Sequence, residues 1–202
     1  GLKIQLSRLL AGGVKLGFGE RTGIDLPSES RSIWPESVNY FNKKYGPRGW
    51  NPSVVLSLSI GQANNSQTPL NMARFYTALA TDGAASTPQI VAHAPTRKQI
   101  INLDKDKLEG LRLALADVVS RGTAAGAQIQ GLTIAGKTGT AQNPPHPDNA
   151  WFVGYAPVDD PKIVIAVMIE EGLHGSAAAK VATKLMERYL KKRLTLNTVT
   201  ND

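Results

Sequence analysis

The chain has 202 residues, of which 42% are hydrophobic and 19% charged, a balance typical of globular proteins and not of disordered chains. It contains no cysteine, which excludes disulfides, thiolate metal sites and a cysteine nucleophile. The formal net charge of +7 could favour binding to nucleic acid, anionic lipid or acidic polymers. The basic residues are dispersed, however, except in the last predicted helix, where a solvated helix face is the simpler explanation. No nucleic-acid partner is expected, because no recognition helix or aromatic-rich basic motif is found.

The first part of the chain is predicted to begin in a helix and to continue in an irregular segment. Leucines at helical spacing predict a helix over residues 2–16, which Gly17 and Gly19 end. Residues 22–50 are rich in Gly, Pro, Ser and Asn, which favours a long irregular segment. A short apolar run, residues 54–60, follows. Since the chain starts at a glycine inside a helical pattern, we expect it to be cut from something longer. The expected buried face of this helix consists of Leu2, Leu6, Leu9, Leu10 and Val14.

Two further helices are predicted in the middle of the chain. Thr68 and Pro69 are typical of an N-cap and a first helical position, and Gly83 is a plausible C-cap. A second helix is expected from Asp104 to about Gly122. Both have apolar stripes and no catalytic pattern, so we interpret the stripes as core. The stripe residues are Met72, Ala73, Tyr76, Leu79 and Ala80 in the first helix, and Leu108, Leu111, Leu115, Val118 and Val119 in the second.

From residue 132 the pattern changes to strands. Residues 132–142, 150–157 and 162–170 are predicted to form a three-stranded antiparallel meander. The first separator, residues 143–149, is expected not to be strand because it holds three prolines. A helix capped by Ser176 should cover the meander. Its expected apolar face consists of Ala178, Val181, Ala182, Leu185 and Tyr189. The predicted fold class is therefore α+β, with helices followed by the meander and a covering C-terminal helix.

Lys137-Thr138-Gly139-Thr140 lies inside the first predicted strand. These residue types suit the binding of a carboxylate: the lysine supplies positive charge, the hydroxyls donate hydrogen bonds, and the glycine lets a ligand backbone approach closely. The alternative is an ordinary strand with a surface lysine. The four residues are the candidate substrate-binding residues.

Other candidate sites are weaker. The three histidines, His93, His146 and His174, are far apart in sequence and lack the spacing of metal ligands, so neither a metal nor a cofactor is expected. The Gly-x-Ser-x-Gly sequence of a nucleophile elbow is absent. The pair Glu170 and Glu171 could meet Lys137 across the sheet, although solvent-exposed charges at a strand end are the default interpretation.

The order of motifs along nearly the whole chain resembles the penicillin-binding proteins, specifically the class B monofunctional transpeptidases of the penicillin-binding protein 2 type. Lys-Thr-Gly is one of the three signature motifs of penicillin-binding proteins and serine β-lactamases. The segments that carry the resemblance are Thr22-Gly-Ile-Asp-Leu-Pro27, Ile60-Gly-Gln62, Thr68-Pro-Leu70, Ala135-Gly-Lys-Thr-Gly-Thr-Ala-Gln142 and Ala150-Trp-Phe-Val-Gly-Tyr-Ala-Pro157.

Two signature motifs of this family do not occur where they are expected. No serine has a lysine three residues later, and Ser37-Val38-Asn39 follows a segment that its Ser-x-Asn counterpart should precede, so we interpret it as a coincidence in a loop. The resemblance thus predicts that residues 1–193 are the C-terminal part of a transpeptidase domain and residues 194–202 a tail. The nucleophilic serine would lie in a missing N-terminal half.

The resemblance implies acyl transfer on peptidoglycan stem peptides through a serine acyl-enzyme, with covalent inhibition by β-lactams. It implies that Lys137 and Thr140 are catalytic: Lys137 provides the positive field, and the Thr140 backbone N–H is one oxyanion-hole donor. It further implies that the Thr138 and Thr140 hydroxyls bind the terminal carboxylate. Implied partners are stem peptides, β-lactams, the N-terminal half and cell-elongation proteins, at the extracytoplasmic face of a bacterial membrane.

Two alternatives stay open at this point. One is a serine β-lactamase or β-lactam sensor domain of the same superfold, which shares the Lys-Thr-Gly motif. The other is a non-catalytic module that only binds anionic cell-wall polymer or another protein. The Thr-Gly-Ile-Asp-Leu-Pro segment and the Thr-Pro-Leu segment favour the transpeptidase.

Overall fold

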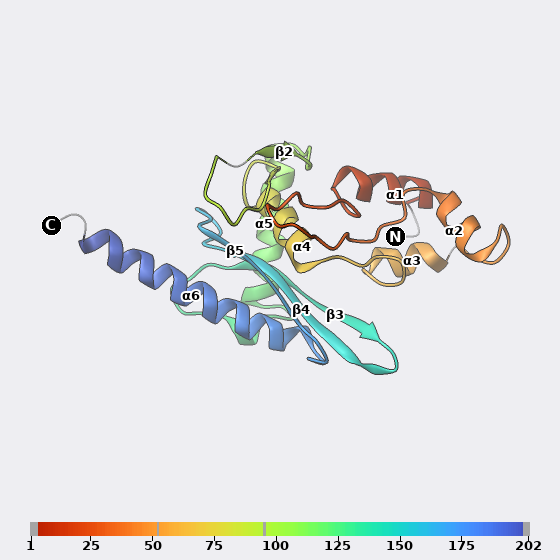
Figure 1. The fold of residues 1–202 in the computed structure, drawn as a ribbon. Helices are drawn as coiled ribbons and strands as arrows, with labels where there is room; N and C mark the ends of the chain where they lie inside the picture. Colours follow the sequence, from red (N-terminus) through yellow and green to blue (C-terminus); the bar gives the residue numbers. More distant parts are fainter. Residues whose placement is uncertain (1–3, 52, 95, 200–202) are drawn as a thin grey trace.

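The computed structural model describes residues 4–51, 53–94 and 96–199 and has an α+β architecture (Figure 1). Along the chain, three short helices precede a longer one, a two-stranded ribbon and a fifth helix, and the three-stranded sheet and the last helix follow. These elements are α1 (Leu6–Lys15), α2 (Val38–Tyr45), α3 (Ser53–Ser59), α4 (Pro69–Ala80), β1 (Ala84–Ser86), β2 (Arg97–Gln99), α5 (Lys105–Ser120), the 3-10 helix η1 (Ala125–Ala127), β3 (Ala135–Asn143), β4 (His146–Ala156), β5 (Ile163–Ile169) and α6 (Gly175–Val199). Among the described helices, none combines the length and apolar character needed to cross a membrane.

The predicted antiparallel meander is confirmed. The strand order is β3-β4-β5, with Lys137 opposite Val153 and Val153 opposite Ala166. The prediction that residues 143–149 contain no strand was wrong, since β3 reaches Asn143 and β4 begins at His146. The register shifts between residues 141 and 143, so the proline at position 147 lies in a bulge, where a missing backbone N–H removes no regular ladder bond.

The sheet is covered on both faces, as Figure 1 shows for α6 on one side and α4 and α5 on the other. Phe152 of β4 is fully buried in a cluster that includes residues of α6, and its neighbour Val153 is buried with residues of α4 and α5. Successive side chains of a strand point to opposite faces, which explains why adjacent residues enter different clusters. β3 is the outer strand of this sheet, so one of its edges has no partner strand among the described elements.

The last helix covers the sheet as predicted, but only part of its predicted apolar face is buried. Val181, Leu185 and Tyr189, predicted to be buried, are 44%, 49% and 41% exposed. Ala178 and Ala182 are buried as predicted, and Ala179, Thr183 and Met186 are buried in place of the other three. Three alanines at the contact let the helix axis approach the sheet closely, and this close approach decides which face is buried. The helix continues through Val199, so residues 194–199 of the expected tail are helical.

The two middle helices begin as predicted. The Thr68 hydroxyl accepts a hydrogen bond from the Asn71 N–H at the start of α4, and Pro69 is the first helical residue. In α5, Leu108 and Val119 are buried, but Leu111 was wrongly assigned to the core and is 39% exposed. Of the α4 stripe, Tyr76, Leu79 and Ala80 are buried, whereas Met72 and Ala73 are only partly buried.

The segment predicted to be irregular contains helix α2, and the following apolar run forms α3. Phe41 of α2 is fully buried beside Trp34 and Leu58, in a small core that also includes Leu10 of α1. Helices this short are not stable alone, so this packing is what stabilises them. In α1, Leu6 and Leu9 are partly buried, Val14 is 39% exposed, and Leu2 lies outside the described residues.

Candidate active site

The four candidate residues Lys137–Thr140 lie together on β3, the outer strand of the sheet. Lys137 and Thr140 are exposed, while Thr138 and Gly139 are partly buried. Thr138 pairs with Phe152, which belongs to the cluster beside α6, and Lys137 pairs with Val153, which belongs to the cluster beside α4 and α5. The hydroxyls of Thr138 and Thr140 therefore share one face of the strand, and the Lys137 side chain starts from the other.

The unpaired edge of β3 carries backbone groups that side chains contact from outside the sheet. The Gln62 Nε2 donates to the Thr140 carbonyl oxygen at 3.2 Å, and the Lys137 Nζ donates to the Thr138 carbonyl oxygen at 2.8 Å. Residues of an antiparallel strand alternate between exchanging both backbone hydrogen bonds with their partner and exchanging none. The two contacts are those expected if Thr138 and Thr140 occupy the non-hydrogen-bonded positions of the β3-β4 pair. The backbone N–H and C=O groups of such residues point away from β4.

Gln62 belongs to the Ile60-Gly-Gln62 segment, one of those that carry the family resemblance. It lies in a turn between Gly61 and Ala63, whose φ angles are 80° and 60°, and its backbone N–H donates to the Ser57 carbonyl oxygen. The turn therefore holds the Gln62 side chain against a strand 78 residues further along the chain. No local sequence signal could have predicted this contact with Thr140.

A second unpredicted residue, Thr123, lies beside the motif. Its hydroxyl oxygen is 2.6 Å from that of Thr138, a hydrogen bond in which either hydroxyl could be the donor. The turn after α5 is well fixed, because the Ala124 N–H donates to the Val118 carbonyl oxygen and Ala124 is buried. Lys137, Thr138 and Thr140 are thus accompanied by two residues from other elements, Gln62 and Thr123.

The N-terminus of α6 packs directly on the backbone of the motif. A Cβ atom at Gly175 would lie 2.6 Å from the Gly139 carbonyl oxygen and 2.9 Å from both the Gly139 nitrogen and the Thr138 Cβ. Carbon atoms do not approach backbone atoms this closely, so only glycine fits at position 175 without moving the strand or the helix.

The loop that joins β5 to α6 is tied to β4. The Glu171 N–H donates to the Asn149 side-chain oxygen, and the Leu173 N–H donates to the Asp148 carbonyl oxygen. The Glu171 carboxylate lies 3.6 Å from the His146 Nδ1. Within the described residues, no three or more His, Asp or Glu side chains come together in a way that could hold a metal ion.

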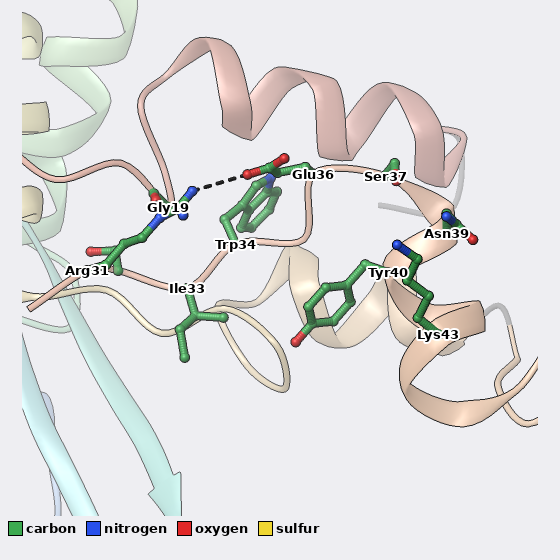
Figure 2. Close-up of a pocket in the computed structure, with 10 residues that line it drawn as sticks. Gly19, Arg31, Ile33, Trp34, Glu36, Ser37, Asn39, Tyr40 and Lys43 are labelled. Carbon is green, nitrogen blue, oxygen red and sulfur yellow. Dashed lines mark hydrogen bonds and ion pairs between the residues drawn. The ribbon is translucent and has the colours of Figure 1, made fainter.

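The Ser37-Val38-Asn39 sequence is not placed at this strand. It begins α2, with Ser37 at the N-cap position, so the prediction that it lies in a loop was only partly right. Ser37 and Asn39 line a shallow hollow of about 390 Å³ together with Tyr40, beside the ion pair of Arg31 and Glu36, whose atoms are 3.1 Å apart (Figure 2). All residues that line this hollow belong to positions 19–43, so it is separate from the edge of β3.

Comparison with known proteins identifies the family. The penicillin-binding protein transpeptidase domain matches residues 2–187. The peptidoglycan D,D-transpeptidase MrdA of Acinetobacter baumannii is 33% identical over 205 residues, which cover 89% of this chain and 30% of that protein. The structure of penicillin-binding protein PBP2 from Helicobacter pylori superposes with a TM-score of 0.85 at 30% identity, covering 94% of this chain and 36% of that one, and it has also been solved in complex with MreC.

A third relative is also a penicillin-binding protein 2. PBP2 of Pseudomonas aeruginosa, solved in complex with WCK 5153, has a TM-score of 0.79 at 32% identity, with coverage of 93% of this chain and 43% of that one. This chain therefore spans 30%, 36% and 43% of the length of these three relatives. The resemblance to the penicillin-binding protein 2 type is confirmed, and the chain belongs to the penicillin-binding protein transpeptidase domain family.

Proposed function

We propose that this chain is part of a peptidoglycan D,D-transpeptidase that cross-links stem peptides by acyl transfer and is acylated by β-lactams. The observation that carries the proposal is the free edge of β3, where Lys137, the hydroxyls of Thr138 and Thr140, and backbone groups facing away from β4 lie together. The curated relative from Acinetobacter baumannii bears the same activity in its name.

In the proposed reaction a serine oxygen attacks the carbonyl carbon of the D-Ala–D-Ala peptide bond. The C–N bond breaks, the terminal D-Ala leaves with a proton on its amine, and an acyl ester remains on the serine. The amine of a second stem peptide then attacks this ester, forms the cross-link and returns the proton to the serine oxygen. The reaction requires no cofactor.

Three of the four motif residues have a role in the proposed reaction. Lys137 supplies the positive charge that orients the substrate and assists proton transfer. The Thr138 and Thr140 hydroxyls donate to the terminal carboxylate, since charge-assisted hydrogen bonds are short and strong. The Thr140 N–H, on the free edge, is one oxyanion-hole donor, and losing one such donor typically costs about 10²–10³ in rate.

The nucleophile is proposed to lie outside this chain, in an N-terminal half that contacts it, because none of its own serines has a lysine three residues later. The complex of Helicobacter pylori PBP2 with MreC supports the proposal that this protein also has a protein partner, for which the family resemblance implies cell-elongation proteins. We place the protein at the extracytoplasmic face of the bacterial membrane, where peptidoglycan is assembled, and assign its anchor to a segment outside this chain.

A fluorescent penicillin tests the proposal. The protein expressed from its complete reading frame should form a covalent adduct, whereas the isolated 202-residue chain should not. In the complete protein, Lys137→Ala should slow acylation far more than Lys184→Ala, since Lys184 is an exposed lysine of α6. Equal effects of the two substitutions would show that the site is elsewhere, and labelling of a serine in the isolated chain would place the nucleophile within it.

The same assay separates the alternatives. A transpeptidase adduct should persist for many minutes, whereas a β-lactamase would release it within seconds. A non-catalytic module would form no adduct and would keep any salt-dependent binding to anionic cell-wall polymer after Lys137→Ala.

A further inference from the structure

The hydroxyl of Thr138 has a hydrogen-bond partner that the proposed mechanism does not use. Thr123 and Thr138 lie 15 residues apart, and their hydroxyl oxygens are 2.6 Å from each other. A hydroxyl has one proton to donate and two lone pairs that accept. If the Thr138 proton points to Thr123, it is not available to a ligand.

A bound carboxylate resolves this ambiguity. An ionised carboxylate only accepts hydrogen bonds, so the Thr138 hydroxyl must donate to it. Thr123 must then donate to Thr138, which gives a chain of two hydrogen bonds that point from Thr123 through Thr138 to the ligand. Hydrogen bonds arranged head to tail in this way polarise one another and strengthen the terminal donor.

The backbone around Thr123 suits this role. The turn that carries it is held by two hydrogen bonds, from the Ala124 N–H to the Val118 carbonyl oxygen and from the Ala125 N–H to the Gly122 carbonyl oxygen, both at 3.0 Å. The Thr123 side chain itself is exposed, so it contributes little to the core. A fixed backbone with an exposed hydroxyl is what a positioning residue requires.

We infer that Thr123 is a positioning residue, which orients the Thr138 hydroxyl as a donor to the carboxylate of the stem peptide or β-lactam. This inference rests on the proposed function. Thr123 does not itself touch the ligand. Its contribution should therefore appear only for ligands that carry a free carboxylate, and only while Thr138 retains its hydroxyl.

The test compares Thr123→Val, Thr123→Ser and Thr138→Val in the protein expressed from its complete reading frame. The readout is the second-order rate constant of acylation by benzylpenicillin and by its methyl ester, which lacks the charged carboxylate. Thr123→Val should slow acylation by benzylpenicillin about 2- to 13-fold, the range expected for one hydrogen bond, and Thr123→Ser should restore the rate. The methyl ester should be affected little.

The chain offers a matched control in another hydroxyl pair, Thr87 and Thr96, whose oxygens are 2.7 Å apart. Thr96→Val makes the same chemical change outside β3 and should leave both rates unchanged. In the double variant Thr123→Val/Thr138→Val, the effects should not multiply, because the second substitution removes the group that the first one orients.

The inference would be overturned by equal slowing for penicillin and its ester, by failure of serine to restore the rate, or by multiplicative effects of the two valine substitutions. An unmodified protein that penicillin does not acylate at all would instead refute the proposed function, and this inference with it. Normal acylation with a neutral Thr123→Val would refute the inference alone.

Discussion

Replacing Gly175 by alanine tests whether the close contact between α6 and β3 holds the motif strand in place. The added Cβ would lie 2.6 Å from the Gly139 carbonyl oxygen and 2.9 Å from the Gly139 nitrogen. These obstacles are backbone atoms, which no side-chain rotation can move, so the helix or the strand must shift. Overpacking of this kind typically costs about 1–3 kcal/mol, against a helix-propensity gain for alanine of at most about 1 kcal/mol.

The assay is urea unfolding of the complete protein, in which Gly175→Ala should lower the midpoint without changing the slope. Acylation by penicillin should slow as well, because the strand that shifts carries Thr138 and Gly139. Gly110 of α5 provides the matched control, since a Cβ there meets nothing within 4 Å. Gly110→Ala should stabilise by about 0.5–1 kcal/mol, and a Gly175→Ala variant of similar stability would refute the reasoning.

Two further predictions concern contacts between distant segments. Gln62→Ala should leave stability nearly unchanged and raise the acylation rate up to several-fold, because it frees the Thr140 carbonyl oxygen to accept from a ligand N–H. Slower acylation would show that Gln62 instead supports the strand. Hydrogen bonds from the Val91 and Ile90 N–H groups tether residues 90 and 91 to the Asp25 carboxylate and lower the pKa of Asp25 from 3.8. These hydrogen bonds should therefore weaken as the pH falls below 3.8 through the lowered pKa. Asp25→Ala should speed hydrogen exchange of both amides at neutral pH.

The three strands of the meander were predictable from the sequence, because alternation and turn residues act over a few neighbouring positions, whereas the short ribbon of β1 and β2 was not predicted. The structure confirms the meander, which was predicted from this local information alone. Helix α2 was not predictable in the same way. Its sequence follows a stretch rich in Pro and Ser, and its stability comes from burying Phe41 in a small core with Leu10 and Leu58, which belong to two other helices.

The partly wrong prediction for the buried face of α6 has a similar cause. Helical spacing permits either Val181 and Leu185 or Ala179 and Met186 to join Ala178 and Ala182 against the sheet, and hydrophobicity alone favours the larger residues. The structure buries the second pair, because small side chains allow the close approach that Gly175 also requires. The stripe of α6 that is buried thus depends on the distance between α6 and the sheet. The sequence of α6 alone does not specify this distance.

The candidate site also combines features that depend on local sequence with features that depend on contacts between elements. Alternation along β3 can be read from sequence, and it places Thr138 and Thr140 on one face and Lys137 on the other. The environment of each hydroxyl cannot be read in this way, because Thr123 and Gln62 reach the strand from other elements. A one-residue slip of β3 would exchange its faces and separate every one of these contacts at once. The site therefore depends on the register of one edge strand, and the residues that fix that register or pack on it should affect acylation even though they do not contact the ligand.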